Sequence, residues 1–110
     1  MNNKFRQLID RVYEKTDEGV LEWREAAADD AFEVDLGNRT LMVFRGQTPH
    51  ENLSYIGVTL FDELGRIVES ETFPENTDFS STRAENLYRL ARSKARGSER
   101  TLDELLRELG

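Results

Sequence analysis

Residues 53–73 (LSYIGVTLFDELGRIVESETF) constrain the fold more than any other stretch of the chain. Two runs of alternating apolar side chains flank the segment 62–65, which ends in Gly65. This arrangement is typical of a β-hairpin with a three-residue loop, in which the glycine takes the left-handed conformation that closes a bulged turn. The sequence therefore predicts two antiparallel strands at the centre of the fold.

The length of this loop also predicts which side chains face each other across the hairpin. Counting outward from the turn pairs Phe61 with Ile67 and Tyr55 with Phe73 on one face of the sheet. Because side chains alternate between the two faces of a strand, a shift of one residue would move every one of them to the other face.

A second hairpin precedes this one. Phe32 and Val34 alternate with acidic residues, and Gly37-Asn38 suits a two-residue loop. With that loop, Val34 faces Leu41 and Phe32 faces Val43, so one face of the pair is continuously apolar. The register is supported by this match.

Both hairpins leave apolar side chains on the second face of the predicted sheet. A face of this kind needs a cover, either another helix or a second subunit. Six residues form the candidate interface, namely Met42, Phe44, Tyr55, Phe61, Ile67 and Phe73.

The segments before the hairpins contain a helix and a short strand. Apolar residues at helical spacing predict a helix over residues 4–18, and Gly19 follows it as a left-handed helix end. Residues 20–26, which include the only tryptophan, predict a short strand.

The segments after the hairpins favour two helices that fold back on the sheet. Residues 74–81 are a predicted loop, and Thr82-Arg83-Ala84-Glu85 has the pattern of a capping box at a helix start. Gly97 ends this helix, and Thr101 and Glu104 repeat the capping pattern before a last helix. That helix carries an apolar stripe of leucines at 102, 105, 106 and 109.

Segregated helices and strands joined by short turns predict one α+β domain over residues 1–110. We expect an N-terminal helix, an antiparallel meander of about five strands, and two C-terminal helices. The chain has 110 residues, of which 34% are charged and 37% hydrophobic, so the core should be small and the surface highly charged.

The charge balance and the cysteine count exclude several classes of protein. There is no cysteine, which removes disulfides, thiolate metal sites and thiol nucleophiles. The net charge of -7 weighs against bulk nucleic-acid binding. No stretch approaches the roughly 18 apolar residues of a membrane span, and the first ten residues lack the apolar run of a signal peptide. We expect no membrane association and a cytoplasmic location.

Few residues are candidates for chemistry. His50, the only histidine, lies in a polar loop, and Ser80-Ser81-Thr82 fit helix capping better than nucleophilic catalysis. Residues 14–35 hold nine acids and two bases, a pattern that favours a solvated acidic face over a divalent metal site. Trp23 and Tyr88 fit a core better than a ligand platform. We therefore expect no catalytic residue, no metal and no cofactor, and a protein that is not an enzyme.

The most concentrated charge in the chain lies on the predicted helix near residues 83–96. This segment has five bases and one acid, and Arg89, Arg92 and Arg96 cluster opposite its apolar side. They form a candidate anion-binding or nucleic-acid-binding face. The alternative is that these arginines solubilise the outer surface or pair with the acidic stretch of the same protein.

Three short motifs resemble those of a set of small bacterial proteins of uncharacterised activity. These are K-T-x-x-G-x-L-x-W at residues 15–23, a D-x-x-G turn at residues 62–65 within a β-meander, and L-Y-x-x-A-R at residues 87–92. The resemblance spans most of the chain and implies a stand-alone cytoplasmic domain. It implies no catalytic residues.

These observations together predict a non-enzymatic protein-interaction module. We expect it to be a homodimer or a small regulatory or chaperone-like partner, because the predicted sheet has more apolar surface than one layer of helices covers. The alternative function is anion or nucleic-acid binding through the basic helix face.

Overall fold

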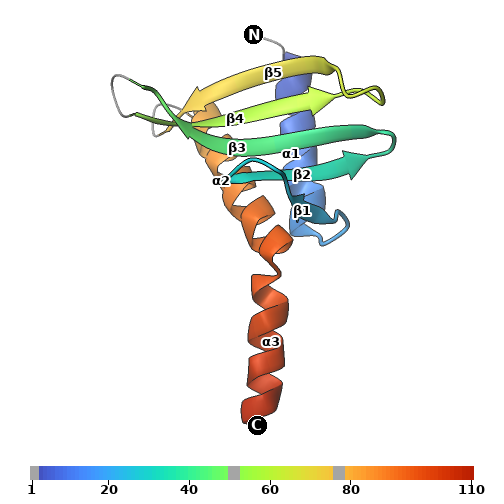
Figure 1. The fold of residues 1–110 in the computed structure, drawn as a ribbon, viewed down its shortest axis with the longest axis vertical. Helices are drawn as coiled ribbons and strands as arrows, with labels where there is room; N and C mark the ends of the chain where they lie inside the picture. The colour runs from blue at the N-terminus through green and yellow to red at the C-terminus, as the bar shows by residue number, and fades with distance from the viewer. Residues whose placement is uncertain (1–2, 50–52, 76–78) are drawn as a thin grey trace.

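The computed structural model describes residues 3–49, 53–75 and 79–110. One helix precedes five strands, and two helices follow them (Figure 1). In chain order the elements are α1 (Asn3–Asp17), β1 (Trp23–Glu25), β2 (Ala31–Leu36), β3 (Arg39–Gln47), β4 (Ser54–Phe61), β5 (Ile67–Pro74), α2 (Phe79–Arg96) and α3 (Ser98–Leu109).

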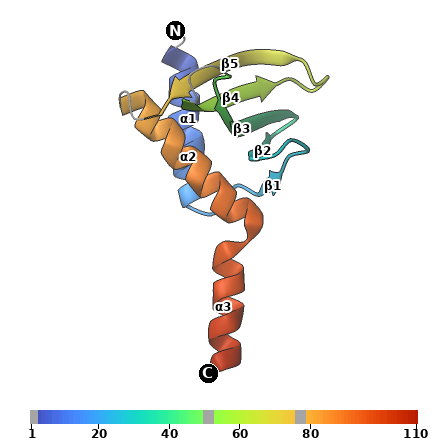
Figure 2. The same ribbon diagram turned by 60° about the vertical axis from the view of Figure 1, so that its left-hand side comes forward.

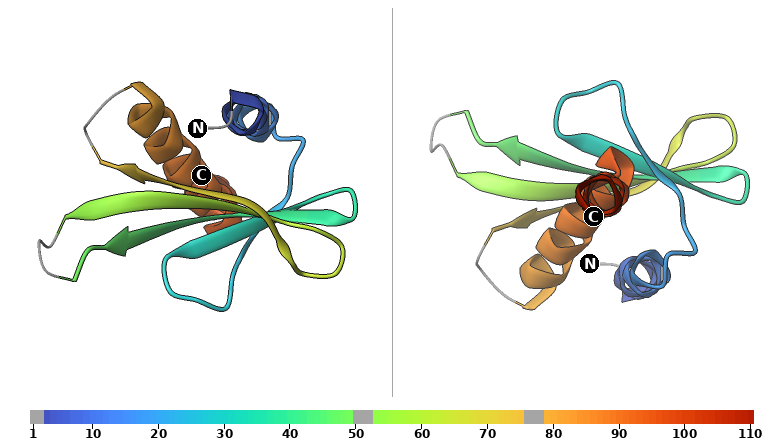
Figure 3. Two further views of the ribbon diagram at one scale, coloured as in Figure 1. Left: turned by 90° about the horizontal axis from the view of Figure 1, so that it is seen from above. Right: turned by 90° about the horizontal axis from the view of Figure 1, so that it is seen from below.

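The five strands form one antiparallel sheet whose spatial order, β1-β2-β3-β4-β5, repeats the order along the chain. Helices α1 and α2 lie together on one face of this sheet, which we call the inner face (Figure 3). The predicted α+β meander with an N-terminal helix and two C-terminal helices is confirmed.

The core fills the space between the inner face and the helices α1 and α2. Phe5, Ile9 and Val12 point from α1 into this core, as their helical spacing predicts. From α2, Leu87 and Ala91 are fully buried. The largest fully buried apolar side chains are Phe32, Leu41, Ile56, Leu87, Val34, Val43 and Val58.

Helix α1 ends as its sequence indicates. Gly19 has a φ of 78°, and its N–H donates to the carbonyl of Thr16 at 3.0 Å. The next N–H, from Val20, donates to the carbonyl of Lys15 at 3.1 Å. These two bonds satisfy the last helical carbonyls and turn the chain toward β1.

The hairpin of β2 and β3 has the predicted register. Val34 pairs with Leu41 and Phe32 with Val43 across the Gly37-Asn38 loop. All four side chains are buried on the inner face, so the predicted register and the predicted apolar face of this pair are confirmed.

The hairpin of β4 and β5 differs from its predicted register by one residue. Gly65 has the expected left-handed conformation, with a φ of 79°, and Phe61 pairs with Ile67 as predicted. Beyond that pair a β-bulge places one additional residue, Val68, in β5. The predicted pairing of Tyr55 with Phe73 is therefore wrong, because Phe73 pairs with Ile56 instead.

The two C-terminal helices begin earlier than their capping patterns predict. Helix α2 starts at Phe79, so Thr82 lies inside the helix and does not cap it. Helix α3 starts at Ser98, directly after Gly97, whose φ is 64°. The expectation that both helices fold back is correct only for α2, because α3 extends away from the sheet (Figures 1 and 2).

Candidate functional site

The face of the sheet opposite α1 and α2, called here the outer face, has no helix over it among the described residues (Figure 3). Met42, Phe44, Tyr55 and Phe61 lie on this face and are partly exposed, and Ile67 is 66% exposed. Five of the six predicted interface residues are thus brought together on one open surface.

Phe73, the sixth predicted interface residue, does not belong to this surface. The bulge in β5 turns its side chain to the inner face, where it is 4% exposed and packs in the core. The guanidinium of Arg6 lies 5.8 Å from the centre of its ring. The prediction for Phe73 is therefore wrong, and the reason is the additional residue in the strand.

Two aromatic rings on the outer face lie directly against glycines of the neighbouring strands. A Cβ atom placed on Gly57 would overlap the ring of Phe44, and one on Gly46 would overlap the ring of Tyr55. The two rings meet edge to face, with their centres 6.3 Å apart. The glycines thus allow the rings to approach the backbone closely and cover it with apolar side chains.

The outer face becomes polar toward β1 and β2. Arg24 donates to Glu33 and to Asp35, both at 2.9 Å. The hydrogen bond from Arg24, supported by one from Thr40, lowers the pKa of the Asp35 carboxyl below its usual value. These charged side chains form a polar margin beside the apolar surface.

The predicted basic face of α2 is split by contacts within the chain. Arg96 donates to Glu25 at 3.1 Å and lies over the ring of Phe32, 5.4 Å from its centre. Arg89 and Arg92 are exposed. Part of the basic helix therefore pairs with the acidic stretch of the same chain, which was the alternative interpretation of these arginines.

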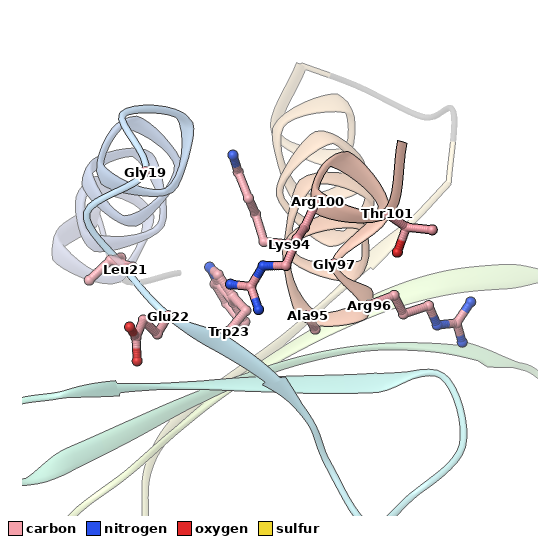
Figure 4. Close-up of a pocket in the computed structure, with 10 residues that line it drawn as sticks. All are labelled: Gly19, Leu21, Glu22, Trp23, Lys94, Ala95, Arg96, Gly97, Arg100 and Thr101. Atoms are coloured by element: carbon pink, nitrogen blue, oxygen red, sulfur yellow. The ribbon is translucent and has the colours of Figure 1, made fainter. Parts of the chain in front are cut away.

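A cleft lies where α2 meets α3, and sequence patterns did not indicate it. Its volume is about 690 Å³. Lys94 and Arg100 extend toward it from the helices, and Leu21, Glu22 and Trp23 form the opposite wall (Figure 4). The residues of this wall follow α1, about 75 positions away along the chain from the helix junction, so only the fold brings the two sides together.

The sequence also raised acidic residues, two aromatic residues, serines near the start of α2 and the single histidine as candidates. Within the described ranges, no group of three or more His, Cys, Asp or Glu could hold a metal ion. Trp23 and Tyr88 are buried in the core, and burial together with the nearby charge of Asp30 raises the pKa of the Tyr88 hydroxyl. Ser81 is buried within α2, and His50 lies outside the described residues.

Helix α3 exposes a continuous apolar surface, which we call the leucine stripe. It consists of Leu102, Leu105, Leu106 and Leu109, whose exposed fractions range from 46% to 84%. Every described side chain from Arg100 to the end of the chain is exposed. The sequence predicted this stripe on a helix expected to fold back on the sheet, but no side chain that the structure describes in α3 belongs to the core.

Comparison of the chain with family models, with curated proteins and with solved structures gave no match. Among the helices that the structure describes, none combines the length and the apolar composition that crossing a membrane requires.

Proposed function

We propose that this chain is a non-enzymatic protein-interaction module that self-associates, with a regulatory or chaperone-like role. The observation that carries the proposal is the leucine stripe, since four large apolar side chains of one helix remain in water after the core is complete. Fully burying a leucine is worth about 1.5–3 kcal/mol, so covering the stripe offers a substantial driving force for association.

The outer face of the sheet supports the same proposal. It adds a second apolar surface, formed by Met42, Phe44, Tyr55, Phe61 and Ile67, to that of α3. Monomeric proteins rarely expose contiguous apolar patches of more than a few hundred Å². Two exposed apolar surfaces on one small domain favour a function in assembly.

The charges around the stripe favour a protein partner over a lipid surface. At 100° per residue, Asp103 and Glu108 lie on either side of the stripe. Helices that bind membrane surfaces usually carry lysine and arginine at these positions, which attract anionic lipids. The cytoplasmic location predicted from the sequence is part of this proposal.

The solution mass, measured by light scattering over a range of concentrations, tests self-association. We expect a species of twice the 12.7 kDa of one chain. Because each protomer carries a net charge of -7, added salt should screen the repulsion and strengthen the dimer. A mass of one chain at every concentration and salt level would rule the proposal out.

Anion or nucleic-acid binding remains the second candidate, and the exposure of Arg89 and Arg92 is the observation that favours it. The test is the fluorescence anisotropy of a labelled oligonucleotide at increasing salt. Binding of this kind weakens as salt rises, opposite to the response expected of self-association. Loss of binding in the double variant Arg89→Ala/Arg92→Ala would support this function, and binding that ignores both substitutions would remove it.

A further inference from the structure

We propose that two copies of the chain exchange their α3 helices, so that the leucine stripe of each lies on the outer face of the other's sheet. This inference rests on the self-association proposed above and names its surfaces. Each protomer has one uncovered amphipathic helix and one uncovered apolar sheet face. Packing a helix on a sheet is the ordinary way in which proteins bury both kinds of surface.

The direction of α3 favours a second copy over the same chain as its binding site. The junction with α2 is a single residue, Gly97, and α3 begins there with a hydrogen bond from the N–H of Thr101 to the Gly97 carbonyl. The helix points away from its own sheet (Figures 1 and 2). To reach its own outer face, it would have to reverse its direction at this one residue.

The start of α3 is in a suitable place for the exchange. Arg96, the last residue of α2, bonds to Glu25 in β1, so α3 leaves the protein beside one edge of the sheet. A two-fold axis then places each helix against the partner's sheet through identical contacts.

The area required by a stable dimer favours exchange over a simple pair of α3 helices. Standard interfaces bury about 800 Å² on each partner. Two paired helices would use only one side of a helix about 18 Å long, which its 12 residues determine. Exchange uses the same side of α3 and the sheet face as well, in both protomers, and it leaves neither apolar surface exposed.

The first experiment compares two leucine substitutions that are matched in chemistry and exposure. Leu106 in the stripe is 69% exposed, and Leu64, in the turn between β4 and β5, is 71% exposed. We expect Leu106→Glu to raise the dimer dissociation constant by at least about 100-fold, since a two-fold dimer buries this leucine twice. Leu64→Glu should leave the dimer intact. Circular dichroism should show both variants folded, because neither side chain is in the core.

The second experiment identifies the surface that α3 touches. The chain has no cysteine, so each single-cysteine variant carries one thiol. Leu106→Cys is mixed with Met42→Cys, whose position is on the outer face, and the mixture is oxidised. Exchange predicts a disulfide between the two different variants, seen by mass spectrometry of the cross-linked peptides. The mixture of Leu106→Cys with Leu64→Cys is the control and should give little such product.

The outcomes separate this inference from the proposed function. A cross-link between two copies of Leu106→Cys, with none to Met42→Cys, would show helix pairing and overturn the exchange while self-association stands. A dimer that survives Leu106→Glu would do the same. A monomer whose double variant Leu106→Cys/Met42→Cys closes an internal disulfide would show that α3 covers its own sheet. A monomer with α3 in solvent would overturn both proposals.

Discussion

Trp23 donates its indole N–H to the side-chain hydroxyl of Thr16 at 2.9 Å, and both residues are buried. The hydroxyl of Thr16 in turn donates to the carbonyl of Val12 at 2.7 Å. This chain of hydrogen bonds connects the first strand to the last turn of α1. It also satisfies the only polar atom of the indole inside an apolar core, where an unpaired donor is costly.

Replacing Thr16 with valine should destabilise the protein by about 1–3 kcal/mol, because the indole N–H would remain buried without an acceptor. The measurement is chemical denaturation followed by circular dichroism, which also reports on variants that lack the single tryptophan. Thr16→Ser keeps the acceptor and is the control. In a Trp23→Phe background, which has no indole, the cost of Thr16→Val should shrink, and equal costs in the two backgrounds would contradict the proposed coupling.

The bulge in β5 predicts very different losses of stability for substitutions at two residues that the sequence places on the same face. Phe73→Ala should cost about 3–5 kcal/mol, because the ring fills the core. Ile67→Ala should change the stability of the monomer by no more than about 0.5 kcal/mol, because the side chain is mostly in solvent. Urea denaturation of both variants at low protein concentration checks the difference, and similar costs would mean that the register has no bulge.

The two hairpins differ in how far the sequence determines their register. The pairing of Val34 with Leu41 was predictable because the two-residue loop at Gly37-Asn38 leaves one register that keeps the apolar face intact. In β5 the apolar side chains are few, and Glu69 and Glu71 occupy inner-face positions at the edge of the sheet. The alternation there is too weak to reveal an additional residue.

The candidate site was predictable in its composition but not in its arrangement. The aromatic residues on the outer face follow from the alternation along β3 and β4, and the leucine stripe follows from helical spacing. The direction of α3 depends on two backbone torsions at Gly97, which no periodicity encodes. For the same reason the cleft between Trp23 and Arg100 could not be foreseen, since its walls come from segments far apart in the chain.

Adding a methyl group to Gly57 tests the packing of the outer face. Gly57→Ala should cost about 1–3 kcal/mol, because the new Cβ forces the ring of Phe44 off the sheet. The same substitution in a Phe44→Ala background should be neutral or stabilising, since alanine otherwise suits a strand better than glycine. Thermal denaturation of the four proteins of this cycle measures the coupling, and additive effects would show that the ring does not cover the glycine.

The turn between β4 and β5 should make the protein less stable at acidic pH. Asp62 accepts hydrogen bonds from the N–H groups of Arg66 and Leu64, both at 2.9 Å, and a third from the Arg66 side chain. These bonds lower the pKa of Asp62 below its usual value. A carboxyl group with a lowered folded pKa stabilises the protein above its unfolded pKa of about 3.9, and this contribution disappears as the pH falls through the folded value.

The corresponding measurement is the denaturation midpoint between pH 7 and pH 2.5. Asp62→Asn should be less stable than the parent protein at neutral pH, and the difference should shrink below about pH 4. Glu63→Gln removes a charge from the same turn without touching the bonds to Leu64 and Arg66, so it controls for net charge. A constant difference across the whole pH range would contradict this assignment.

The order of the strands has a consequence for the speed of folding. Every pairing in the sheet joins strands that are neighbours in the chain, so each can form by closing a short hairpin. The contact between α1 and α2 is different, because it brings together segments separated by most of the sequence. We expect the hairpins to organise first and the two helices to dock on each other late, after the transition state, so that substitutions between α1 and α2 accelerate unfolding more than they slow folding.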